Sequence, residues 1–112
     1  MASLAVVALL AGCGGGGSNS TFSPAACRAQ ADKVVAHADS MLLHYRGGTV
    51  YPADMSYLGL KSSLDRFDRG GCPATMLGTR LRHTFTPSQR KTLLALLPRA
   101  SATRIHDAID AA

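Results

Sequence analysis

Residues 23–48 of the 112-residue chain read SPAACRAQADKVVAHADSMLLHYRGG, and this stretch predicts a long amphipathic helix. Ser23 offers a hydroxyl for the N-cap, and Pro24 suits the first helical position because the N–H that it lacks would be unpaired there. Gly47 and Gly48 are typical of the residues just after a helix C-terminus. Between these ends, apolar residues recur at spacings of three and four, which places them on one helix face: Cys27, Ala31, Val34, Val35, Ala38, Met41, Leu42 and Tyr45.

A second helix is expected on the other side of these glycines. It starts near Pro52 or Ser56 and runs to Arg69, where Gly70 and Gly71 end it. A short connection between two helices favours antiparallel packing, so the two should form an αα-hairpin. The apolar face of the second helix consists of Ala53, Tyr57, Leu60, Leu64 and Phe67.

The rest of the chain predicts shorter helices. Pro73 can open a third helix, and the capping box TPSQ at residues 86–89 starts a fourth, which Pro98 ends. Ser101 or Thr103 is expected to cap a last short helix. The fold class is therefore all-α, a small bundle of about four or five short helices that forms a single domain over residues 23–112. The inward face of the third helix should consist of Ala74, Leu77, Leu81 and Phe85.

The residues before this domain have a different character. An apolar run, LAVVALLA at residues 4–11, leads into Leu10-Ala11-Gly12-Cys13. This ending resembles the lipobox of bacterial lipoproteins, in which the cysteine is lipidated and becomes the first residue of the mature chain. The resemblance implies that residues 1–12 are a signal peptide, and because Met1-Ala2-Ser3 carries no basic residue, we expect the signal to be truncated at its start.

The lipobox resemblance also implies where in the cell the protein is located. Residues 13–22 would comprise the lipidated cysteine and a flexible linker, since the tract GGGGSNS at 14–20 gains little from ordering. The anchor places the protein in the bacterial cell envelope, and Gly14 rather than Asp after Cys13 favours the outer membrane, facing the periplasm. The alternative is a buried terminal strand or helix followed by a glycine linker.

The chain has three cysteines, and an odd count in an exported protein needs an explanation. Lipidation of Cys13 supplies one and leaves Cys27 and Cys72 as a pair in an oxidising compartment. An antiparallel hairpin brings these two cysteines together, so a disulfide would close its open end and stabilise the fold by about 4 kcal/mol. A reactive cysteine or half a metal site is the alternative, although no CxxC or HxxxH spacing supports it.

The net charge of +5 lies entirely in the C-terminal half of the chain. Outside the cytoplasm such an excess would meet an acidic protein segment or an anionic envelope polymer, and export argues against nucleic acid. The alternative is that these side chains only keep the surface soluble. The residues that could form one basic binding face are Arg80, Arg82, His83, Arg90 and Lys91.

Nothing in the sequence indicates a catalytic site, a cofactor, a metal or a small-molecule substrate. His37 and His44 are two helical turns apart, roughly 10 Å, which is too far to share a metal ion. His83 and His106 are isolated, while Asp65 and Asp68 have Arg66 and Arg69 as neighbours for salt bridges.

The sequence therefore predicts a membrane-anchored, non-enzymatic envelope lipoprotein that acts as a binding, accessory or pilot-like subunit. In size, helical class and anchoring it is similar to the pilotins of type II secretion systems, a likeness of architecture alone. The alternatives are an inhibitor or immunity-type lipoprotein that blocks an envelope enzyme, a structural envelope component, and a small envelope enzyme.

Overall fold

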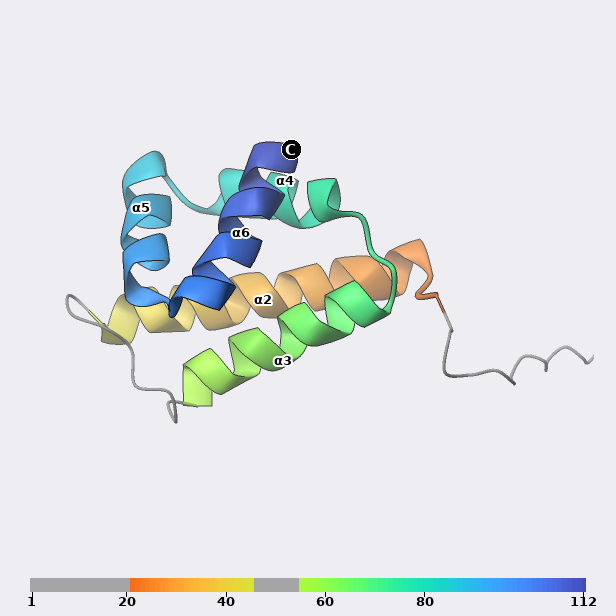
Figure 1. The fold of residues 1–112 in the computed structure, drawn as a ribbon, viewed down its shortest axis with the longest axis horizontal. Helices are drawn as coiled ribbons and strands as arrows, with labels where there is room; N and C mark the ends of the chain where they lie inside the picture. The colour runs from red at the N-terminus through yellow and green to blue at the C-terminus, as the bar shows by residue number, and fades with distance from the viewer. Residues whose placement is uncertain (1–20, 46–54) are drawn as a thin grey trace, which may run out of the picture.

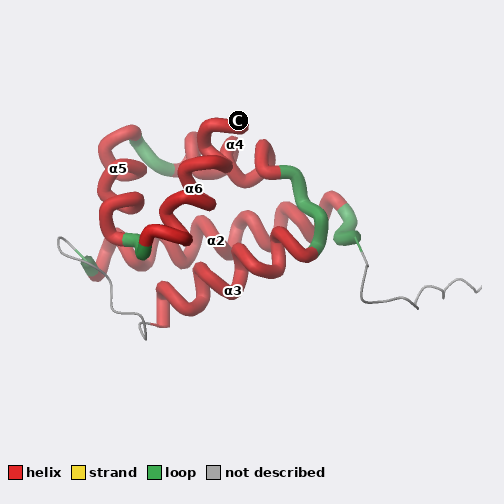
Figure 2. Tube along the Cα trace, viewed as in Figure 1, coloured by secondary structure: helices red, strands yellow, loops and turns green. Residues whose placement is uncertain are grey.

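The computed structural model describes residues 21–45 and 55–112, and within them every regular element is a helix. Figure 2 shows these helices joined by short loops, with no strand in the parts of the chain that it colours. The all-α prediction is confirmed. In chain order the helices are α2 (Pro24–His44), α3 (Met55–Arg69), α4 (Ala74–Thr84), α5 (Pro87–Leu96) and α6 (Arg99–Ala111).

Helix α2 starts as its sequence predicts. The Ser23 hydroxyl accepts a hydrogen bond from the N–H of Ala26 at 3.1 Å, and Pro24 occupies the first turn. The predicted apolar face is buried at Cys27, Ala31, Val34, Ala38 and Met41, whereas Val35, Leu42 and Tyr45 are only half-buried at its edge. The predicted end at Gly47 and Gly48 lies outside the described residues.

Helix α3 ends in a Schellman motif centred on Gly71. The N–H of Gly71 donates to the carbonyl of Asp68, and the N–H of Cys72 donates to the carbonyl of Phe67, both at 3.1 Å. This motif needs a left-handed residue, and Gly71 has φ of +71°. The predicted buried face of α3 is confirmed at Tyr57, Leu60, Leu64 and Phe67, and Ala53 lies outside the described residues.

Two predictions about the C-terminal helices are wrong. Ala74 is exposed rather than inward, because the first turn of α4 borders an opening between α3 and α6. Helix α6 starts at Arg99, with Pro98 as its N-cap residue, so Ser101 and Thr103 lie within a 13-residue helix instead of capping it. Ser101 is buried there, and its hydroxyl lies 3.0 Å from that of Tyr57 on α3.

The helices form two layers, as Figure 1 shows. Helices α2 and α3 lie side by side as the predicted hairpin, and α4, α5 and α6 cover one of its faces. Helices α4 and α6 pack so closely at Gly78 that a Cβ atom there would lie 1.9 Å from the carbonyl oxygen of Ala108. The largest fully buried side chains come from both layers and include Phe67, Met41, Leu60, Leu81, Leu93 and Ile105.

Candidate functional site

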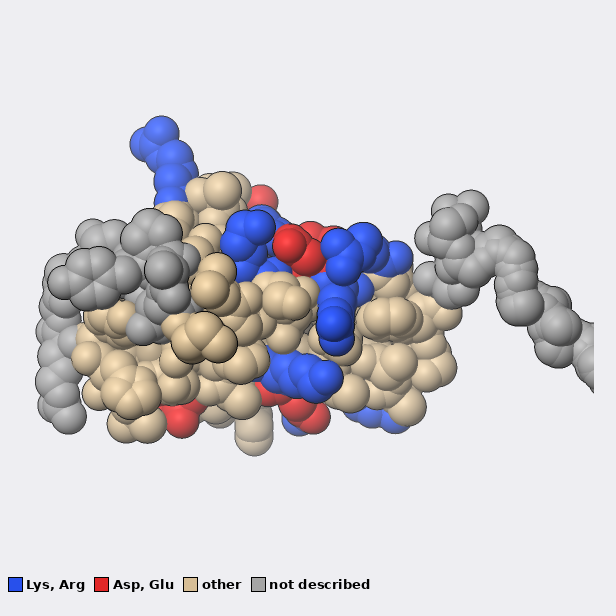
Figure 3. Space-filling model, turned by 90° about the horizontal axis from the view of Figure 1, so that it is seen from below, with Lys and Arg blue, Asp and Glu red and all other residues tan. Residues whose placement is uncertain are grey.

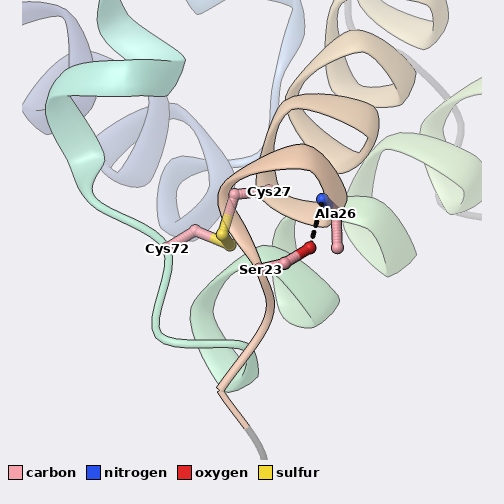
Figure 4. The surroundings of a disulfide bond; sticks show 4 residues. All are labelled: Ser23, Ala26, Cys27 and Cys72. Atoms are coloured by element: carbon pink, nitrogen blue, oxygen red, sulfur yellow. Dashed lines mark hydrogen bonds between the residues drawn. A yellow bond between two sulfur atoms is a disulfide. The ribbon is translucent and has the colours of Figure 1, made fainter.

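A disulfide joins the two ends of the hairpin. The Sγ atoms of Cys27 and Cys72 are bonded, and their Cα atoms are 5.5 Å apart, which confirms the predicted pair (Figure 4). The N–H of Phe22 also donates to the carbonyl of Gly70 at 2.8 Å. The ring of Phe22 covers the Cα of Gly70 so closely that a Cβ atom would not fit. We call Phe22, Cys27, Gly70 and Cys72 the disulfide pole.

The disulfide pole fixes where the preceding chain enters the domain. Because Phe22 is hydrogen-bonded to the end of α3, the described part of the chain begins at this end of the hairpin. Cys13, the predicted lipidation site, lies outside the described residues. A lipid anchor at Cys13 would therefore be connected to the domain at its disulfide pole.

The basic residues singled out in the sequence have different partners in the structure. Arg80 pairs with the carboxylate of Asp32 on α2. The Nε atom of Arg82 donates to the carbonyl of Ile109 at 3.1 Å, and this gives a carbonyl in the last turn of α6 a hydrogen-bond partner. Arg90 does the same for α4, since its Nη1 atom donates to the carbonyl of Phe85 at 2.6 Å and to that of Arg82 at 3.3 Å.

The structure thus brings Arg82 and Arg90 together and leaves Arg80 apart. Two positions along a helix correspond to about 200° of rotation, so Arg80 and Arg82 leave α4 on different sides. His83 and Lys91 are exposed, and no described carboxylate lies within ion-pair distance of either. A basic face that binds an acidic segment or an anionic polymer stays a prediction.

A pocket of about 230 Å³ opens between α3, α4 and α6. Small-molecule sites usually enclose about 300–1,000 Å³, so this volume suits one side chain better than a cofactor. The floor of the pocket is apolar and consists of Leu64, Phe67, Leu77 and Ala108. Its rim consists of Asp68, Ala74, Arg104 and Asp107.

An arginine on α6 holds the two sides of this pocket together. The Nη1 atom of Arg104 lies 2.9 Å from Oδ1 of Asp65, and its Nη2 atom lies 2.6 Å from Oδ2 of Asp68. The hydrogen bond from Arg104 lowers the pKa of Asp65 below its ordinary value. Burial of Arg104 opposes its charge, but its hydrogen bonds to Asp68 and Asp65 outweigh this and raise its pKa.

Sequence reasoning missed the role of Arg104. The sequence offers Arg66 and Arg69 beside Asp65 and Asp68, and Lys61 at i,i+4 from Asp65. The Lys61–Asp65 pair is present at 3.7 Å, but the other described ion pairs of these carboxylates are to Arg104. The available signal was the i,i+3 spacing of two acids on one helix face. That spacing indicated a shared partner but could not show that it comes from α6.

The histidines are spread over the surface. The ring of His37 packs over Gly59, and Nδ1 of His44 lies 3.4 Å from the hydroxyl of Ser40. His106 lies 3.5 Å from both Asp107 and Asp110 on its own helix. Within residues 21–45 and 55–112, no three His, Cys, Asp or Glu side chains are placed to hold a metal ion.

None of the helices that the structure describes is long and apolar enough to span a membrane. Comparison with protein-family models, with curated proteins and with solved structures gives no match. The disulfide pole and the pocket, together with the lipobox that the sequence predicts, are therefore the features from which a function can be inferred.

Proposed function

We propose that the protein is a lipid-anchored lipoprotein of the bacterial cell envelope, and that its helical domain is a non-enzymatic subunit that binds a partner protein. The use of the three cysteines carries the proposal. Cys27 and Cys72 bond to each other, so Cys13 is the one cysteine left for acylation, and it stands in the lipobox Leu10-Ala11-Gly12-Cys13. A stable disulfide also suits the oxidising compartment to which export leads.

In this proposal the mature chain begins at Cys13. Residues 1–12 act as the signal peptide, and the linker that follows Cys13 leads to the disulfide pole. Two or more acyl chains would make the attachment stable, since a single chain holds a protein only marginally. Gly14 after the acylated cysteine directs the protein to the outer membrane, facing the periplasm.

The proposed docking site is the pocket between α3, α4 and α6. Its apolar floor suits an apolar side chain, because transfer of such a side chain from water is favourable. At its rim the side chains of Asp68 and Asp107 are 63% and 72% exposed, so both carboxylates are available to a partner.

Charge selects the occupant of this pocket. The residues that line the pocket include two carboxylates, Asp68 and Asp107, and one cation, Arg104. The pocket is thus an acidic place on a chain of net charge +5. We assign it to a partner segment that inserts an apolar side chain and carries a basic residue beside it, which would pair with Asp68 or Asp107.

The anchor is tested by Cys13→Ala in the full chain, produced in a Gram-negative host. We expect the wild-type chain to take up labelled palmitate and to yield an acylated N-terminus at Cys13 by mass spectrometry. The variant should take up none, and the double variant Cys27→Ala, Cys72→Ala should keep the label. Palmitate uptake by Cys13→Ala would contradict the lipoprotein assignment, and so would no uptake by the wild-type chain when a Met-Lys-Lys segment is placed before Ala2 to complete the truncated signal.

The pocket is tested with two synthetic amphipathic peptides, one of Leu and Lys and its counterpart of Leu and Glu. The protein is the chain from residue 13 with Cys13→Ser, which keeps every described residue. We expect the Leu/Lys peptide to shift the amide NMR signals of Leu64, Leu77 and Ala108, and the Leu/Glu peptide to leave them unchanged.

Two pairs of variants show whether the peptide uses the pocket. Asp68→Asn with Asp107→Asn should weaken binding about three- to tenfold, as expected for two exposed ion pairs. The equal charge change Asp39→Asn with Asp110→Asn should have little effect. Ala74→Trp should block the pocket, whereas Ala36→Trp on the exposed face of α2 should not. Equal effects within either pair would show that the pocket is not the docking site.

A further inference from the structure

Basic side chains gather at the same end of the hairpin as the disulfide pole. Arg66 and Arg69 lie in the last turn of α3, and Arg28 follows Cys27 near the start of α2. All three are exposed, and no described carboxylate forms an ion pair with any of them. We call Arg28, Arg66 and Arg69 the pole arginines.

The other end of the hairpin differs in character. The first turn of α3 carries no charged residue, and the large apolar side chains that are exposed in the described domain are found here, at Leu43, Met55 and Leu58. Figure 3 views the molecule from below Figure 1, on the side where the hairpin of α2 and α3 lies. Where grey atoms do not cover it, Lys and Arg lie mainly over the middle of this face with acidic side chains among them, and the end away from the start of α2 is mostly uncharged.

We infer that the pole arginines hold the disulfide pole against anionic lipid headgroups, so that the domain sits on the membrane in one orientation. This inference builds on the proposed lipid anchor, because a tether that enters at Phe22 keeps this end of the domain next to the bilayer. A basic residue near an anionic surface contributes about 1 kcal/mol, which corresponds to about fivefold in partitioning. A short tether and a few such residues together give the domain a defined orientation on the membrane, which neither supplies alone.

Three features favour headgroups over an acidic protein as the ligand of the pole arginines. Arg28 comes from a different helix than Arg66 and Arg69, so the three exposed charges are contributed by both helices of the hairpin. No described pocket includes any of the three. The disulfide and the Phe22–Gly70 hydrogen bond also make this end rigid, which lets all three guanidinium groups meet a flat surface together.

The inference is tested by vesicle co-sedimentation of the chain from residue 13 with Cys13→Ser, which lacks the acyl site. We expect it to bind vesicles of phosphatidylcholine with about 30 mol% phosphatidylglycerol and to leave pure phosphatidylcholine vesicles unbound. Raising the salt from about 0.1 M to about 1 M should release it, because the screening length falls from about 10 Å to about 3 Å.

Matched variants separate the contribution of the pole arginines from that of the net charge of the chain. Arg66→Gln with Arg69→Gln should weaken partitioning about 25-fold, at about fivefold for each residue, and adding Arg28→Gln should weaken it further. Lys91→Gln with Arg99→Gln removes the same charge from exposed positions on α5 and α6 and should change partitioning less than twofold. Circular dichroism melts of both double variants show that the fold is kept.

Equal losses in the two double variants, or no binding to anionic vesicles by the parent chain, would overturn the inference. Its failure is distinct from that of the lipid anchor. Vesicle binding is measured without the acyl group, and palmitate uptake at Cys13 is measured without reference to the pole arginines.

Discussion

Arg104→Met should remove the polar link between α3 and α6 and destabilise the fold by about 2 kcal/mol. The guanidinium of Arg104 makes two hydrogen bonds to carboxylates, at 2.9 Å and 2.6 Å. A hydrogen bond to a charged group is worth about 1.5–3 kcal/mol when it is buried, and an exposed ion pair about 0.2–1 kcal/mol. Arg104 is 29% exposed and Asp68 is 63% exposed, so the pair to Asp68 falls in the lower range.

The methionine keeps an apolar stem beside the pocket, so the variant tests the charge more than the packing. Urea unfolding at pH 7 measures the loss, and about 2 kcal/mol corresponds to a fall in melting temperature of about 8–16 °C for a domain of this size. Arg66→Met and Arg69→Met are matched controls, because neither arginine has a described ion pair, and each should change stability by less than about 0.5 kcal/mol.

The effect of Arg104→Met should depend on pH in one direction. The hydrogen bond from Arg104 lowers the pKa of Asp65 in the folded chain below its ordinary value of 3.8, so the unfolded chain binds this proton more readily. The stabilisation is therefore present above the ordinary pKa and is lost as the pH falls through the lower, folded pKa. The difference between wild-type and Arg104→Met should be full at pH 7 and shrink as the pH falls below the ordinary value of 3.8. A difference that does not shrink, or one no larger than that of Arg66→Met, would refute the role given to Arg104.

Two other substitutions test the packing of the domain. Cys27→Ser with Cys72→Ser should lower the free energy of unfolding by about 4 kcal/mol, as the chain-entropy model gives for a sequence separation of 45, and urea unfolding with and without reductant checks it. A loss below about 1 kcal/mol would show that the hairpin does not need the bond. Gly78→Ala should cost about 1–3 kcal/mol, because the added Cβ meets the Ala108 carbonyl of a packed helix. Gly59→Ala is its control and should cost less, because the Cβ there meets only the ring of His37, which can swing away, and equal losses in melting temperature would contradict this account.

The hairpin could be predicted because its signals are local and agree with one another. The apolar period of α2, the Ser23-Pro24 start and the glycines after α3 each act within a few residues, and the structure keeps all three. The Cys27–Cys72 pair follows from matched spans, since Cys27 lies 17 positions before the end of α2 at His44 and Cys72 lies 17 positions after the start of α3 at Met55. The capping box at Thr86 is likewise a local device and is present with both of its hydrogen bonds.

The missed features are those that depend on another helix. Ser101 has the chemistry of an N-cap, but its hydroxyl lies against that of Tyr57, 44 residues away in the chain. Arg104 is separated from Asp65 by 39 residues, so a local search finds Arg66 and Arg69 first. Arg82 and Arg90 are close in sequence to other basic residues, yet each satisfies the carbonyls of a helix end, a use that only the packed structure shows.

The two proposed surfaces lie on different sides of α3, which allows the domain to use both at once. Position 68 lies about 100° round the helix from position 69 and about 200° from position 66. Asp68 therefore borders the pocket beside Arg104, whereas Arg66 and Arg69 leave the helix elsewhere. A domain that rests on the membrane through its pole arginines would keep the pocket open at its flank. The free energies of membrane contact and of partner binding would then be additive. Asp68→Asn with Asp107→Asn should therefore leave vesicle partitioning no weaker than in the parent chain.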